Sequence, residues 1–180
     1  VNQSAFDIEF DKTTVKPGTF LLEKLCSGAY LGPVALCALK AAAKDRIFSK
    51  EVSEEILKIS VFNTVDISEY MEQPFDNKGV LSKIICLSSN SEDADLAYQI
   101  LDAIVERSSR YAAAILIACS IKTKAGKKAS EPICILCNGS TFFKFKVVIS
   151  NSSFSSSLYS IMALSIISVE NIIKAISTCS

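Results

Sequence analysis

One long helical pattern constrains the fold of this chain more than any other feature of its sequence. Between residues 91 and 121, apolar side chains recur at roughly helical spacing, at Leu96, Ile100, Ile104, Tyr111, Ala114, Ile115 and Ala118. Ser91 is a good N-cap, and the acids that follow it favour the positive end of the helix dipole. The second half, AAAILIAC, is apolar on every side, which predicts burial between layers.

Helix and strand signals alternate along the rest of the chain. Residues 34–44 are rich in Ala and Leu and favour a helix, with Pro33 suited to its first turn. Ser49 is expected to cap a second helix that continues to residue 59. Residues 132–137 read as a strand, followed by a turn at Gly139. This alternation predicts an α/β fold.

Charge and length exclude several classes of protein. The chain has 180 residues, 19 Lys and Arg against 19 Asp and Glu, and a net charge of zero. That length suits one domain with a sizeable core. A hydrophobic fraction of 49% argues against disorder, and the balanced charge argues against nucleic-acid binding through phosphate contacts.

Histidine is absent from the chain, which excludes Ser-His-Asp and Cys-His catalysis, His-ligated zinc and histidine pH switches. The seven cysteines are mostly in apolar runs, and we expect no signal peptide. We therefore expect reduced thiols in a cytoplasmic protein. Cys134 and Cys137 form a lone CxxC, which lacks the two further ligands of a zinc site, so no metal site is predicted. The apolar run near the C-terminus is too short to span a membrane.

The most specific motif is KPGTFLLEKLCSGAYLG, at residues 16–32. It resembles a large-lobe segment of the hexokinase family, of the form NPG-x5-EKMISGxYLGE. The positions that match in order and spacing are Pro17, Gly18, Glu23, Lys24, Ser27, Gly28, Tyr30, Leu31 and Gly32.

The resemblance continues in order from about residue 7 to residue 146. The lead-in FDIEFDKTTVKPG is similar through Asp7, Asp11 and Thr14. A second segment is similar through Phe48, Ser49, Leu57, Phe62, Thr64 and Ser68. RSSRYAAAILIACS resembles a helix of the family, and ICILCNGSTFFKFK resembles its strand and phosphate turn. The resemblance implies an actin/ribonuclease-H-like α/β fold, with residues 1–180 as the C-terminal portion of the large lobe.

The resemblance also implies a site for a hexose and ATP. It assigns Glu23 to the hexose, and a carboxylate can accept two sugar hydroxyl protons in charge-assisted hydrogen bonds. It places Gly28, Ala29, Thr64 and Ser68 beside the nucleotide. It places Gly139, Ser140 and Thr141 in the turn under the phosphates, where hydroxyls and backbone N–H groups suit an anion. Mg²⁺ is the cofactor that accompanies ATP.

Each of these residues also has a structural interpretation. Glu23 could pair with a lysine on a helix surface, and Ser27-Gly28 could be a plain helix cap. Gly139 could serve only a hairpin turn. Thr64 and Ser68 could cap helices or face solvent.

The chain departs from the family pattern at several positions. Pro33 replaces the Glu after YLG, Phe20 replaces a commonly polar position before Glu23, and Asn138 replaces the Asp of DGS. The tail after Gly139 contains no glycine, so the family's adenosine loop has no counterpart.

The motifs that would complete a kinase site are absent from this sequence. Phosphoryl transfer needs a base, a glycine hairpin on the phosphates and Mg²⁺ ligands. In hexokinases these come from the small lobe and the preceding part of the large lobe, so we expect a missing N-terminal lobe and no catalytic residue here. The parent would transfer the γ-phosphate of ATP to the 6-hydroxyl of a hexose, and this chain alone would be inactive.

Two alternatives remain open at this point. One is a non-catalytic sugar- or nucleotide-sensing module, or a structural half-domain. The other is a generic α/β domain that resembles the family by chance. Five segments that match the family in the same order argue against this alternative.

Overall fold

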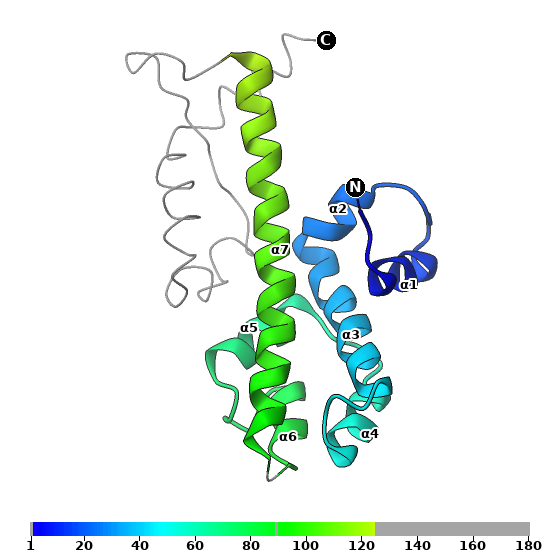
Figure 1. The fold of residues 1–180 in the computed structure, drawn as a ribbon, viewed down its shortest axis with the longest axis vertical. Helices are drawn as coiled ribbons and strands as arrows, with labels where there is room; N and C mark the ends of the chain where they lie inside the picture. Colours follow the sequence, from blue (N-terminus) through cyan, green and yellow to red (C-terminus); the bar gives the residue numbers. More distant parts are fainter. Residues whose placement is uncertain (1, 89, 125–180) are drawn as a thin grey trace. The chain divides into compact units, whose positions relative to one another are not determined.

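The computed structural model describes residues 2–88 and 90–124, which form seven α-helices (Figure 1). These are α1 (Ala5–Thr13), α2 (Leu21–Cys26), α3 (Gly28–Lys44), α4 (Lys50–Lys58), α5 (Thr64–Glu72), α6 (Val80–Ile85) and α7 (Ser91–Thr123). No strand occurs within these described ranges, and the strand predicted at 132–137 lies outside them. The helical part of the α/β prediction is therefore present, and its sheet is untested.

The chain divides into two compact units, residues 1–108 and 109–180, with the boundary inside α7. In the first unit, α3 packs against α1, α2, α4 and α5. Its inward face is built from small and branched residues, including Ala35 and Leu39, which have no exposed surface. Phe62, Ile67 and Leu101 complete this core. Full burial of such a side chain stabilises the fold by roughly 1.5–3 kcal/mol.

The two helices predicted from residues 49–59 and 91–121 are confirmed, with small differences at their caps. Ser49 occupies the N-cap of α4, but its side chain makes no cap hydrogen bond. Its backbone N–H instead donates to Oδ1 of Asp93 at 2.9 Å, and Asp93 is only 1% exposed. Ser91 is the first residue of α7, and Oδ1 of Asn90 accepts the Glu92 N–H at 3.0 Å. Asp93 of α7 thus replaces the predicted Ser49 cap of α4, and Asn90 replaces the predicted Ser91 cap of α7.

Helix α3 begins at Gly28, five residues before the start that Pro33 predicts. Ser27 is its N-cap, and the Ser27 hydroxyl accepts the Ala29 N–H at 3.3 Å. Pro33 therefore lies inside the helix, where it has no N–H to donate to the carbonyl of Ala29.

The burial predicted for the second half of the long helix is not observed in α7. Ile117 and Ile121 are 48% and 71% exposed, although Ala113 is buried. A helix that is apolar on all sides needs neighbours on every side. Within the described part of the second unit, α7 is the only element, so no described neighbour covers these side chains.

None of the helices among the described residues combines the length and apolar character needed to cross a membrane. The cysteines that the structure describes, Cys26, Cys37, Cys86 and Cys119, are all free thiols. Burial raises the pKa of Cys26 and of Cys37 above the ordinary thiol value. The CxxC cysteines lie outside the described residues.

Candidate functional site

Glu23 lies in the first turn of α2 and is exposed. Its carboxylate forms no hydrogen bond or ion pair with any residue that the structure describes. The alternative in which Glu23 pairs with a surface lysine is therefore not seen. The carboxylate keeps its acceptor positions available for a ligand.

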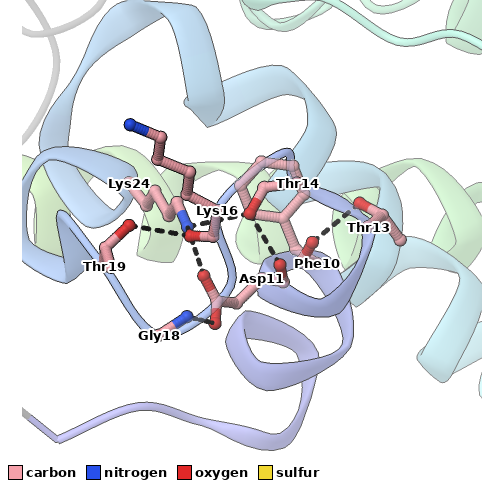
Figure 2. A network of polar contacts seen from close by, with 8 residues as sticks. All are labelled: Phe10, Asp11, Thr13, Thr14, Lys16, Gly18, Thr19 and Lys24. Atoms are coloured by element: carbon pink, nitrogen blue, oxygen red, sulfur yellow. Dashed lines mark hydrogen bonds and ion pairs between the residues drawn. The ribbon is translucent and has the colours of Figure 1, made fainter.

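The next residue, Lys24, is buried and points into the loop that joins α1 to α2 (Figure 2). Its ammonium group donates to the carboxylate of Asp11, to the Thr14 hydroxyl at 2.8 Å and to the Lys16 carbonyl at 2.8 Å. The second oxygen of Asp11 accepts the Gly18 N–H at 2.7 Å. All three ammonium protons therefore have acceptors, as a buried charge requires.

This pairing changes the titration of Asp11. The hydrogen bond from Lys24 and that from the Gly18 N–H hold the pKa of the Asp11 carboxyl below its usual value. The ionised carboxylate is thus the form that the folded loop favours.

The loop between α1 and α2 contains two residues with left-handed backbone. Gly18 has φ of 76°, which glycine adopts without strain. Phe20 has φ of 53°, occupies the N-cap of α2 and is 64% exposed. A left-handed non-glycine residue costs about 1–2 kcal/mol. The Lys24 hydrogen bonds close this loop and offset that strain.

A second ion pair joins α1 to α7 across 100 residues of sequence. The guanidinium of Arg107 donates to both oxygens of Asp7, at 2.8 and 2.9 Å. Asp7 is buried and also accepts the backbone N–H and the hydroxyl of Ser4. The guanidinium also lies over the ring of Phe6, 5.3 Å from its centre. Residues that the sequence motifs single out therefore pair with one another.

The predicted nucleotide segments meet where α3 and α5 begin. The Thr64 hydroxyl donates to the carbonyl of Gly28, 36 residues earlier in the chain, and accepts the Gly32 N–H at 3.2 Å. Thr64 is the first residue of α5, and Gly28 is the first residue of α3. Two helix N-termini, each with partial positive charge, thus lie side by side.

The close approach of α3 to the start of α5 depends on Gly32, and the sequence pattern did not predict this role. A Cβ atom on Gly32 would lie 2.3 Å from the backbone carbonyl carbon of Asn63 and 2.5 Å from the Phe62 carbonyl oxygen. Both are far inside contact distance, so no side chain fits there. A glycine four residues after Gly28 in the motif is the only sequence signal for this contact.

The structure brings together some of the predicted site residues. Gly28, Ala29 and Thr64 form one cluster, and Ser68 is half-buried one turn along α5. Glu23 precedes this cluster on α2. The predicted phosphate-turn residues, Gly139, Ser140 and Thr141, lie outside the described residues.

A metal site built by the protein alone is not present in the described part of the chain. No group of three or more His, Cys, Asp or Glu side chains is arranged there to hold a metal ion.

The chain belongs to the hexokinase family, because the sequence profile of the family described as Hexokinase matches residues 1–153. It is 31% identical to hexokinase-2 of Homo sapiens over 129 residues, which cover 69% of this chain and 14% of that protein. It is 25% identical to a hexokinase of Schwanniomyces occidentalis over 148 residues, which cover 79% of this chain and 30% of that protein. The chain therefore spans less than a third of the length of these relatives.

Proposed function

We propose that this chain carries part of the hexose and nucleotide sites of an enzyme that transfers the γ-phosphate of ATP to the 6-hydroxyl of a hexose. In this proposal Glu23 accepts hydrogen bonds from sugar hydroxyls. Gly28, Ala29, Thr64 and Ser68 form the nucleotide side of the site. Gly139, Ser140 and Thr141 supply the phosphate turn, within an actin/ribonuclease-H-like fold.

The contact between Thr64 and Gly28 is the observation that carries this proposal. The family resemblance assigns the two segments to the nucleotide independently of each other. Their meeting at two adjacent helix N-termini supports a common anionic ligand, since such ends favour negative charge. Glu23 is exposed and forms no hydrogen bond or ion pair within the described part of the chain, which supports a sugar site beside α2.

The described residues fit ATP better than they fit a free metal ion. Two adjacent helix N-termini favour an anion such as phosphate, and no group of three or more His, Cys, Asp or Glu side chains among the described residues could hold a metal ion. We therefore propose that Mg²⁺ is bound through the phosphates of the nucleotide. Its chemistry there is to neutralise charge on the transferred phosphoryl group.

The isolated chain of 180 residues is proposed to be inactive as a kinase. It spans 14% and 30% of the lengths of its Homo sapiens and Schwanniomyces occidentalis relatives, and its motifs include no base for the sugar hydroxyl. Without that base and a cover over the phosphates, positioning of a hexose alone would not give turnover.

Two measurements test this proposal on the same preparation. A coupled assay with glucose and Mg-ATP should show no turnover, whereas calorimetry should detect glucose binding that Glu23→Ala reduces at least tenfold, about 1.4 kcal/mol. Glu51→Ala is the matched control, because Glu51 is also an exposed acid in the first turn of a helix. It should leave glucose binding unchanged.

Each outcome bears on a different part of the proposal. Turnover by the isolated chain would show that it needs no other segment. Equal glucose binding by the Glu23 and Glu51 variants would remove Glu23 from the sugar site. If neither glucose nor Mg-ATP bound, a structural role would replace the proposed one.

A further inference from the structure

We infer that an exposed apolar stripe on the C-terminal half of α7 is the docking face for residues 158–176 of the same chain, which form an amphipathic helix. The stripe consists of Ala114, Ile117, Ala118 and Ile121. The match to the hexokinase family ends at residue 153, so the docked segment lies in a part of the chain that this match does not cover. The inference does not depend on the proposed function.

The stripe has the spacing of a surface against which another helix packs. Its four residues, Ala114, Ile117, Ala118 and Ile121, follow one another at positions i, i+3, i+4 and i+7, so they share one side of α7. Ile117 is 48% exposed and Ile121 is 71% exposed. No charged residue occurs between positions 111 and 121. Water contact with this apolar surface is unfavourable, and a second helix would remove it.

The second compact unit itself contains the chain that can cover this stripe. The unit comprises residues 109–180, and α7 supplies its described part. Residues 125–157 would join α7 to the docked segment, and a flexible chain of that length spans about 30 Å on average. The stripe from Ala114 to Ile121 is only about 10 Å long. The connection is therefore long enough for the segment to return to α7.

The sequence of residues 158–176, which lie outside the described residues, predicts a helix with one apolar side. Its apolar residues alternate at spacings of four and three, at Met162, Ile166, Val169, Ile173 and Ile176. This is the heptad spacing of helices that pack along their length. A strand would instead need apolar residues at every second position. The stripe on α7 repeats at the same spacings of three and four, so the two sides match.

The other side of the predicted helix is polar. It carries Ser160, Ser168, Asn171 and Lys174. Lys174 and Glu170 are the two charged residues of positions 150–180, which is too little charge to keep so apolar a segment solvated on every side. The segment therefore needs an apolar partner for one side and tolerates water on the other.

Photo-crosslinking in the full chain tests this docking directly. The variant Ile121→benzoylphenylalanine should crosslink within one chain to a peptide from residues 158–176, identified by mass spectrometry. Ala112→benzoylphenylalanine is the matched control, because Ala112 is also exposed on α7 but lies nine residues before Ile121. Nine residues are about two and a half helical turns, which places Ala112 on the opposite side of the helix. It should give no such crosslink.

The crosslinked partner of Ile121→benzoylphenylalanine identifies the occupant of the stripe. A crosslink between two chains would make a second copy of the chain the occupant. A crosslink to residues 125–157 would make another segment of the same chain the occupant. Either result, or the absence of any crosslink, would overturn the inference.

Substitutions in the docked segment test whether its apolar side makes the contact. In the chain that carries the Ile121 probe, Ile166→Asp should lower the crosslink yield roughly tenfold, because an unpaired carboxylate is costly to bury. Ile166→Leu should keep the yield, and so should Ser168→Asp, which adds the same charge on the polar side. Circular dichroism melts should show an unchanged first unit in all three, since neither position belongs to it. Equal yields in Ile166→Asp and Ser168→Asp would overturn the proposed contact.

Discussion

At the residue scale, Lys24 and its neighbour Glu23 have different surroundings, since Lys24 is buried and Glu23 is exposed. The buried ammonium group holds the carboxylate of Asp11 and the loop around Gly18, so the start of α2 has one orientation (Figure 2). Glu23, in contrast, is exposed. Of these two adjacent motif residues, Lys24 is buried and hydrogen-bonded within the loop, whereas Glu23 is exposed.

The pairing of Asp11 predicts a defined pH dependence at the residue scale. Because the folded pKa of Asp11 lies below its ordinary value of 3.8, its ion pair stabilises the fold fully above that pH and is lost as pH falls through the lower folded value. We expect Asp11→Asn to lower the thermal midpoint at pH 7 by about 5 °C, and the gap to wild type to close towards pH 2.

Circular dichroism melts between pH 2 and pH 7 measure this gap. Asp45→Asn is the control, because Asp45 is exposed at the end of α3 and forms no side-chain ion pair among the described residues. A gap that persisted unchanged to pH 2 would mean that the carboxylate charge of Asp11 does not contribute to stability.

At the scale of elements, the bidentate pair of Asp7 and Arg107 joins the first helix to the last. Asp7 is 2% exposed, and removal of the guanidinium would leave its charge buried with only Ser4 as a donor. We expect Arg107→Met to lower the free energy of unfolding by about 3 kcal/mol, as for other broken buried pairs. Urea denaturation followed by circular dichroism provides the measurement.

A surface ion pair in the same chain provides the control for Arg107. Lys58 pairs with Glu55 at an exposed position of α4, so Lys58→Met should cost no more than about 0.5 kcal/mol. Equal effects of the two substitutions would contradict a structural role for the Asp7–Arg107 pair. Arg107→Lys should recover only part of the loss, because an ammonium group cannot bind both carboxylate oxygens as a guanidinium does.

At the scale of the whole molecule, the first compact unit ends at residue 108, and its last two residues form polar contacts with residues near its N-terminus. Arg107 binds Asp7, and the Ser108 hydroxyl donates to the Cys26 carbonyl at 3.1 Å. A fragment of residues 1–116 should therefore unfold cooperatively on heating. A fragment of residues 1–104 lacks both ties, and its midpoint should be lower by more than about 10 °C. Equal midpoints for the two fragments would show that the contacts of Arg107 and Ser108 do not contribute to the stability of the first unit.

The sequence predicted helices over 34–44, 49–59 and 91–121, but not α1, α2, α5 or α6. Residues 91–121 and 49–59 form helices because apolar spacing and acidic first turns act within a few residues. The order of the motifs also predicted membership of the hexokinase family. The cluster of Gly28, Ala29 and Thr64 was predicted as a set of residues, but not as a contact.

Contacts between distant residues were decided only by the tertiary structure. Asp93 takes the place of the Ser49 side chain at the start of α4, and Gly28 rather than Pro33 begins α3. The Asp93 contact could not be predicted, because its partner lies 44 residues away and a local pattern carries no information about it, whereas the start of α3 depends on the adjacent Ser27 cap. The exposure of Ile117 follows for the same reason, since burial depends on neighbours that the helix pattern does not specify.

The sequence by itself determined the helices over 49–59 and 91–121 and the family to which the chain belongs, because propensity, capping and motif spacing are properties of short segments. Only the tertiary structure decided what the motif residues do. Lys24 is buried while Glu23 is exposed, and Thr64 spends its hydroxyl on α3. The physical reason is that a polar side chain acquires its role from the partner that satisfies it, and that partner is set by packing.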